Sequence, residues 1–125
     1  MTSNSTREKG GLGESFAAKI LTEMGLHIEE RNYTIKGGEV DIIATDDDEI
    51  AFIEVKTRKK NSMISGIDAV TNAKQKRIIK AAKSYLEKNT PEYYPRFDVF
   101  EITIAENGEF KVLSYDYIKS AFWEK

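Results

Sequence analysis

The sequence has no cysteine and a single histidine, His27, among its 125 residues. Without cysteine the chain forms neither a disulfide framework nor a thiolate metal site, and a reducing, cytoplasmic location is expected. One histidine excludes a paired-histidine zinc site, and no serine context supports a Ser-His-Asp triad. No apolar run approaches the roughly 18 residues of a membrane span, so no membrane partner is expected. The start of the chain lacks the apolar segment of a signal peptide, and residues 1–8 are expected to be a flexible arm.

The chain is expected to fold as one domain over residues 1–125. Its length fits a domain of ordinary size, and its apolar fraction of 40% is close to the globular average. Turn signals and changes of hydrophobic period predict the order α-β-β-β-α-β-β-α, an α/β fold with a mixed central sheet of about five strands flanked by helices. The predicted elements are helices at 7–24, 68–88 and 117–123 and strands at 26–34, 39–45, 50–58, 96–104 and 109–114.

Basic residues gather in one segment, although the whole chain carries a formal net charge of −2. Between residues 56 and 83 there are nine lysines and arginines against one acidic residue, Asp68, so this segment carries +8 and the rest of the chain −10. A local field of that sign attracts an anionic polymer even on an acidic protein. On charge alone, a basic loop and a solvated helix face explain the segment equally well.

Residues 39–45 and 50–58 predict a β-hairpin around a turn at 46–49. A turn of four residues places Asp41 directly opposite Glu54, because the residue numbers of opposite positions then have the same sum. Side chains alternate between the two faces of a strand. One face is expected to be wholly apolar core, with Val40, Ile42, Ala44, Ala51, Ile53 and Val55. The other is apolar near the turn and charged at its far end, with Glu39, Asp41, Ile43, Thr45, Phe52, Glu54, Lys56 and Arg58.

Two carboxylates facing each other across a hairpin repel, since their Cβ atoms are only about 5 Å apart. One carboxyl group could be protonated, Lys56 on the same face could neutralise part of the charge, or a divalent cation could lie between them. Asp41, Glu54 and the carbonyl of Val55 supply the hard oxygen ligands that Mg²⁺ prefers. The alternative is a solvent-facing patch in which Glu39 pairs with Lys56 and the two carboxylates are merely tolerated.

Polar side chains of the two long helices point to the same place. Glu14 lies at the border of the apolar stripe of the first helix and could reach a metal site through a water, although a glutamate near a helix start is also favoured by the helix dipole. Lys74 and Gln75 interrupt the inward stripe of the second helix, one turn before its apolar block. Gln75 is a candidate contact for a metal-bound water or a phosphate. Alternatively, both are long side chains reaching solvent from the start of a helix.

The pattern Asp41, twelve residues, Glu54, Val55, Lys56 resembles the D-x(n)-[DE]-x-K signature of the restriction-endonuclease-like nuclease superfamily. Further stretches, taken in order, resemble the YraN-like family, uncharacterised protein family 0102, and are more distantly similar to archaeal Holliday-junction resolvases. These stretches are GLGE at 11–14, RN at 31–32, GGEVDIIA at 37–44, FIEVKTR at 52–58, KQKRI at 74–78 and RFDV at 96–99. The resemblance covers nearly the whole chain and implies a restriction-endonuclease-like core.

The resemblance also implies roles for single residues. Asp41 and Glu54 correspond to metal ligands for Mg²⁺ or Mn²⁺, and Lys56 to the catalytic lysine. Glu14 corresponds to the helix glutamate and Gln75 to the helix glutamine of the superfamily.

Two functions are open at this point. The first is a metal-dependent endonuclease that hydrolyses phosphodiester bonds in DNA, with DNA favoured over RNA, branched or junction DNA as a candidate substrate and a homodimer as a candidate assembly. The second is a non-catalytic module on a nuclease fold that binds nucleic acid or a repair protein. Either would grip phosphates through Arg58, Lys59, Lys60, Lys74, Lys76, Arg77, Lys80 and Lys83.

Overall fold

Two helices and five strands make up the part of the chain that the computed structural model describes, residues 6–63, 69–89 and 92–124. In chain order they are α1 (Thr6–Glu23), β1 (His27–Ile35), β2 (Gly38–Asp46), β3 (Glu49–Lys59), α2 (Asn72–Asn89), β4 (Tyr94–Ile104) and β5 (Val112–Phe122). The predicted start of the second helix, residue 68, lies outside the described residues. Thr71 precedes α2, and its hydroxyl accepts a hydrogen bond of 3.2 Å from the amide of Lys74, which caps the helix.

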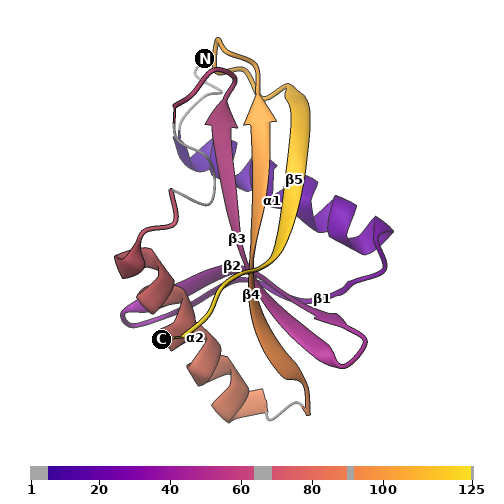
Figure 1. Ribbon diagram of the computed structural model, residues 1–125, viewed down its shortest axis with the longest axis vertical. Coiled ribbons are helices and arrows are strands. Elements are labelled where there is room, and N and C mark those ends of the chain that lie inside the picture. The colour runs from indigo at the N-terminus through magenta and orange to yellow at the C-terminus, as the bar shows by residue number, and fades with distance from the viewer. Residues whose placement is uncertain (1–5, 64–68, 90–91, 125) are drawn as a thin grey trace.

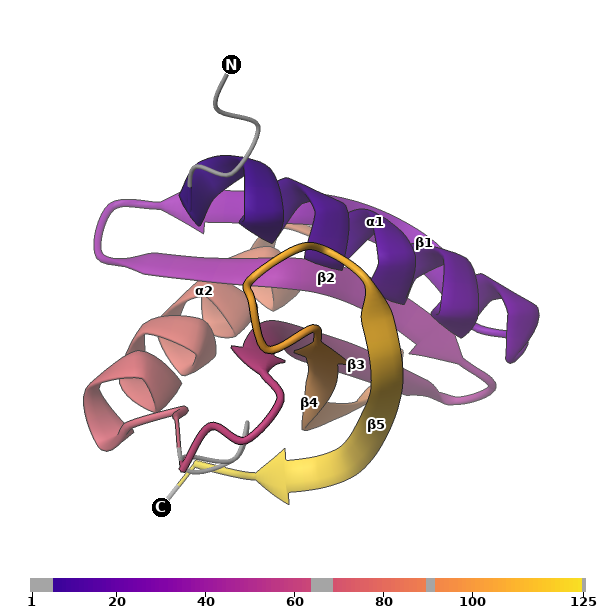
Figure 2. The ribbon, with the colours of Figure 1, turned by 90° about the horizontal axis from the view of Figure 1, so that it is seen from above.

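The strands form one mixed sheet in the order β1-β2-β3-β4-β5 (Figure 1). Neighbouring strands are antiparallel except β3 and β4, which run parallel. A parallel pair needs a crossover connection, and α2 provides it. The two helices cover opposite faces of the sheet, as Figure 2 shows from above. The predicted mixed sheet of five strands flanked by helices is therefore confirmed.

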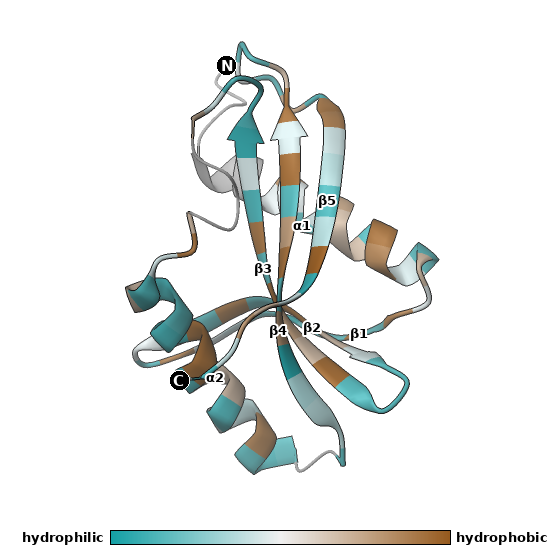
Figure 3. Cartoon of the chain, viewed as in Figure 1, coloured by the Kyte–Doolittle hydropathy of each residue, from teal (hydrophilic) through white to brown (hydrophobic). Residues whose placement is uncertain are grey.

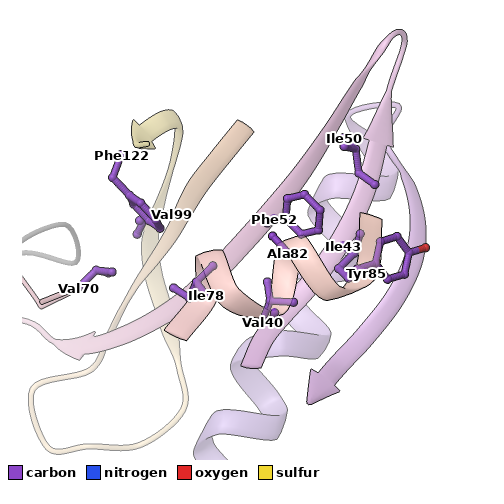
Figure 4. Packing of buried hydrophobic residues seen from close by; sticks show 11 residues of the cluster. Val40, Ile43, Ile50, Phe52, Val70, Ile78, Ala82, Tyr85, Val99 and Phe122 are labelled. Atoms are coloured by element: carbon purple, nitrogen blue, oxygen red, sulfur yellow. The ribbon is translucent and has the colours of Figure 1, made fainter. Parts of the chain in front are cut away.

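Each helix covers its own hydrophobic cluster. The cluster under α2 includes Ile43, Phe52 and Ile78 (Figure 4), and the cluster under α1 includes Leu21 and Ile53. Both faces of the β2–β3 hairpin are thus core near the turn, and the hydrophilic residues of β3 gather toward its C-terminal end (Figure 3). Charged side chains at that end lie where the buried part of the strand gives way to the surface.

The hairpin has the predicted register, with Thr45 opposite Ile50 and Ile42 opposite Ile53. The predicted faces need one correction: Val40 belongs to the cluster under α2, whereas Ile42 belongs to the cluster under α1. Regular alternation would put both on the same face. The change of face falls at Asp41, whose place in the β1–β2 ladder is opposite Asn32, a residue with a positive φ of 54°.

The predicted C-terminal helix at 117–123 is wrong, because these residues continue β5 as far as Phe122. The strand pairs with β4, with Tyr117 opposite Phe100 and Ile118 opposite Val99. Aromatic and β-branched side chains fit a pleated surface, and here they pack across the strand pair. The ring of Phe122 stacks on that of Phe97 at 5.3 Å, which places the end of the strand against the core.

A buried polar network ties the β2–β3 turn to β4 and β5. Asp98, fully buried, accepts hydrogen bonds from Nε of Arg96 at 3.0 Å, from the hydroxyl of Tyr117 and from the amide of Ser120 at 2.8 Å. Arg96 in turn donates to Glu49 at 2.6 Å, at the start of β3. A buried charge needs such partners, and here they also hold the turn whose length sets the hairpin register.

Within the described residues, neither helix is long and apolar enough to cross a membrane.

Candidate functional site

The side chain of Asp41 takes part in the hydrogen bonding between β2 and β3. The strands pair as far as Ile42 and Ile53, and beyond that pair the amide of Val55 donates a hydrogen bond of 2.8 Å to Oδ2 of Asp41. The contact coincides with the change of face at Asp41, opposite Asn32. A carboxylate held in this way by a backbone amide lies between the two strands instead of projecting freely from one face.

Glu54 is the most unusual acidic residue of the site, because it is only 3% exposed. Its Oε1 has no hydrogen-bond partner among the residues that the structure describes. Oε2 lies 3.4 Å from Nζ of Lys56 and 3.8 Å from Nζ of Lys74. Burial raises the pKa of the Glu54 carboxyl to about 8, the negative charge of Asp41 adds to this, and the two lysines oppose it. The site therefore holds acidic groups that are costly to ionise together.

Lys74 brings α2 to the carboxylates. Its Nζ donates to Oε1 of Glu39 at 2.6 Å, so Glu39 pairs with Lys74 and not with Lys56, as the alternative of a solvent-facing patch required. This hydrogen bond lowers the pKa of Glu39. Burial alone would lower the pKa of Lys74, but the hydrogen bond and charge of Glu39 and the charge of Glu54 raise it, so Lys74 stays a cation. Gly38 allows this approach, since a Cβ there would lie 2.7 Å from the carbonyl oxygen of Arg77 in α2.

Sequence reasoning placed Lys74 among the phosphate-gripping residues and missed its contacts with Glu39 and Glu54. The available signal was its position on the inward stripe of the second helix, next to Gln75. Gln75 itself donates from Nε2 to the carbonyl oxygen of Val70 at 3.1 Å, which turns its amide toward the segment before α2.

Glu14 joins the site from α1. Burial, and then the charge of Asp41, raise the pKa of Glu14, while Arg31 and a hydrogen bond from the side chain of Asn32 oppose the rise. Gly13 beside it lets the helix lie directly on β3, because a Cβ there would meet Oγ1 of Thr57 at 2.8 Å. The GLGE and RN stretches thus have a physical role: one brings Glu14 down to the sheet and the other surrounds it.

The predicted phosphate-gripping residues fall into two groups. Arg58 is engaged within its own surroundings, donating from Nη1 to the carbonyl oxygen of Ser62 at 3.0 Å and lying 3.7 Å from Glu101. The exposed residues of the group are Lys59, Lys60, Lys76, Arg77, Lys80 and Lys83. Four of these six belong to α2, so the open basic surface lies mainly along that helix.

The donor set fits a hard divalent cation bound by few protein ligands. Within the described residues no group of three or more His, Cys, Asp or Glu side chains is arranged to hold a metal ion. Asp41 and Glu54 remain, with the carbonyl of Val55 between them in sequence, and the unpartnered Oε1 of Glu54 is an oxygen that lacks the partner a buried polar atom requires. Mg²⁺ is usually bound through one or two carboxylates and completes its shell with water and substrate phosphate.

The mixed sheet, its two flanking helices and the acidic pair with lysine at the end of β3 define a restriction-endonuclease-like core. Within that class the chain belongs to uncharacterised protein family UPF0102, whose model matches residues 13–102. The chain is 43% identical over 122 residues to a UPF0102 protein of Chlorobium chlorochromatii, covering 96% of this chain and 95% of the relative. A UPF0102 protein of Dictyoglomus thermophilum is 41% identical over 117 residues, with 93% and 98% covered, and one of Clostridium perfringens 43% over 115 residues, with 90% and 92% covered.

Proposed function

We propose that this protein is a metal-dependent nuclease that hydrolyses phosphodiester bonds in DNA. The observation that carries the proposal is the environment of Glu54: a carboxyl group almost completely buried beside Asp41, with one unpartnered oxygen and two lysine ammonium groups within 4 Å of the other. A buried carboxylate beside a second one destabilises a fold unless a counter-charge or a ligand compensates it, and such groups cluster at functional sites.

Asp41, Glu54 and the carbonyl of Val55 would hold Mg²⁺ or Mn²⁺, with Glu14 contributing through a water. A bound cation of this kind polarises the scissile phosphate and lowers the pKa of a coordinated water. The amide of Val55 fixes the orientation of Asp41. Because burial and the charge of Asp41 raise the pKa of Glu54, binding of the cation should release a proton at neutral pH.

Lys56 would hold the attacking water or stabilise the negative charge that develops on the phosphate in the transition state. Its Nζ lies 3.4 Å from Glu54, which ties the ammonium group to the acidic pair. Lys74 would supply a second fixed positive charge, which Glu39 and Glu54 share. Gln75, next to Lys74, would contact the coordinated water or a phosphate after leaving the Val70 carbonyl.

The exposed lysines and arginine of α2 would bind backbone phosphates without reading sequence. DNA binding should therefore weaken steeply with salt. The resemblance to junction resolvases makes branched DNA the first substrate to test, and a homodimer would present one site to each of two strands.

The test is cleavage of labelled four-way, flapped and linear DNA with Mg²⁺ or Mn²⁺. Wild-type protein should cleave at least one of these substrates, and Glu54→Ala and Lys56→Ala should each reduce the rate by at least about a hundredfold, as for loss of a group that stabilises transition-state charge. Cleavage that survives both substitutions unchanged would show that another site, or a contaminant, is responsible.

The competing function, a binding module without catalysis, needs only the exposed basic residues of α2 and no metal. A thermal-shift titration with Mn²⁺ separates the two. A metal site should raise the melting temperature of the wild type, and Asp41→Asn should abolish the rise. No rise in the wild type favours the binding module.

A further inference from the structure

A pocket of about 440 Å³ lies beside α2, against the end of β5. Pockets that hold small organic groups start at about 300 Å³. The residues that line it include Gln75, Lys76, Ile79, Lys80, Lys83 and Trp123. The stems of the lysines, Ile79 and the indole ring give it apolar walls, and the ammonium groups give it a positive rim.

Trp123 is the only tryptophan of the chain and is 67% exposed. It directly follows Phe122, whose ring is buried and stacked on Phe97. The core thus anchors the residue before Trp123, and the indole, just beyond the end of β5, lines the pocket. In Figure 1 the end of the chain after β5 runs beside α2. Burying an exposed ring of this size would stabilise a complex more than any other single aliphatic or aromatic side chain of the pocket.

The charge of the pocket suits a phosphate-bearing ligand. Three lysines line it against one glutamate, Glu124. Nζ of Lys83 and Oε2 of Glu124 form an ion pair of 2.5 Å, which holds the end of the chain against α2. Both side chains are more than half exposed, and exposed ion pairs contribute little to stability, so the pairing does not close the pocket firmly. Lys76 remains exposed on the rim, whereas the ammonium group of Lys80, one helical turn away, lies beside Gly37.

The pocket is next to the acidic site. Lys74, which contacts Glu39 and Glu54, and Gln75, which lines the pocket, are consecutive residues in the first turn of α2. The first turn of α2 therefore borders both the acidic site and the pocket, where a single nucleic-acid strand would contact both.

We propose that this pocket binds an unpaired nucleotide of the substrate, with its base stacked on Trp123 and its phosphate beside Lys76. A base in a duplex is stacked between its neighbours and presents no free ring face, whereas an unpaired base stacks readily on an aromatic side chain. The consequence of this inference rests on the proposed nuclease function. The enzyme selects DNA that has a single-stranded segment beside the bond that is cut.

Trp123 provides its own signal, since the chain has no other tryptophan to mask it. We would measure its fluorescence in EDTA, so that no cleavage occurs, during titration with oligothymidylate, oligouridylate and a blunt duplex of the same length. The single strands should quench the fluorescence in a salt-sensitive way, and the duplex should quench it at least about tenfold more weakly. Stronger quenching by oligothymidylate than by oligouridylate assigns the pocket to DNA, and the reverse assigns it to RNA. No quenching by either strand, or equal quenching by the duplex, overturns the proposal.

Variants test the residues by anisotropy of a labelled oligothymidylate. Trp123→Ala should weaken binding roughly tenfold or more, the range expected for loss of one stacked base, and Trp123→Phe should restore most of it. Tyr94→Ala removes another exposed ring, at the start of β4, and should change nothing. Lys76→Glu should weaken binding more than Lys19→Glu, which makes the same charge change on the opposite helix. Equal effects of the matched variants would show nonspecific binding and overturn the proposal.

Failure of this inference and failure of the proposed function look different. If the protein cleaves none of the DNA substrates but its Trp123 fluorescence is quenched by single strands, the nucleotide pocket is supported and the nuclease function is contradicted. If the wild type shows no quenching and Trp123→Ala cleaves as fast as the wild type, the nucleotide pocket is contradicted and the nuclease function is supported.

Discussion

The buried carboxyl group of Glu54 should make the stability of the metal-free protein fall as pH rises. Its pKa is about 8 in the folded protein, whereas the unfolded chain has the ordinary value of 4.5. The folded state therefore prefers the protonated carboxyl. The resulting stabilisation is complete below about pH 4.5 and is lost as pH rises through about 8.

The size of the effect follows from the two pKa values. Each unit of difference is worth about 1.36 kcal/mol, so the loss between pH 4.5 and 8 is on the order of 3 to 5 kcal/mol. Glu54→Gln keeps the shape of the side chain and removes its charge. At about pH 9 this variant should be more stable than the wild type by a similar amount, while near pH 4.5 the two should be nearly equal. For a domain of this size the difference is roughly 10 °C or more in melting temperature.

Urea unfolding followed by circular dichroism in EDTA, at fixed ionic strength, measures the free energy of unfolding across this pH range. Glu87→Gln, which neutralises an exposed glutamate on α2, is the matched control and should follow the wild type. Adding Mn²⁺ at about pH 9 should then stabilise the wild type and leave Glu54→Gln unchanged, because the cation replaces the proton. A Glu54→Gln variant that is less stable than the wild type at high pH would refute the reasoning.

Three further predictions concern neighbouring groups. Lys74→Gln removes the ammonium group that pairs with Glu39, so the pKa of Glu39 should rise in an NMR titration; an unchanged pKa would contradict the ion pair. Asp98→Ala removes the fully buried carboxylate that accepts from Arg96, Tyr117 and the amide of Ser120, and should reduce the free energy of unfolding by about 3–5 kcal/mol in urea; a loss below 1 kcal/mol would contradict the network. Gly13→Ala should destabilise by about 1–3 kcal/mol because its Cβ would meet Thr57, whereas Gly11→Ala, with open space around it, should be neutral or stabilising; equal effects would disprove close packing at Gly13.

The local sequence was sufficient to predict the hairpin at the centre of the fold. The acidic turn limits the loop, and the loop length sets the register as far as Ile42 and Ile53. Beyond that pair the amide of Val55 holds the Asp41 carboxylate beside Glu54. The local sequence was not sufficient for the side chains of Val40 and Glu39. Their directions depend on the change of face at Asp41 and on a lysine from α2, and neither is visible in the alternation of one strand.

Two other features depended on contacts between distant segments. Residues 117–123 have apolar side chains that fit either a short helix or a strand, and pairing with β4 decides for the strand. The RFDV stretch was recognisable only as part of a family pattern. Its physical role appears once Arg96 and Asp98 are seen to bond with Glu49, Tyr117 and the amide of Ser120, which come from β3 and β5.

The most direct test of the central claim is single-turnover cleavage of a labelled branched DNA in Mn²⁺ by wild type, Lys56→Met and Lys60→Met. The two variants remove the same charge from the same stretch of chain, but only Lys56 lies 3.4 Å from Glu54, whereas Lys60 is exposed. Metal-dependent hydrolysis at this site predicts that Lys56→Met loses at least about a hundredfold in rate while Lys60→Met stays within a few-fold of the wild type, and that EDTA stops all cleavage. Equal rates for Lys56→Met and the wild type, or cleavage that continues in EDTA, would contradict it.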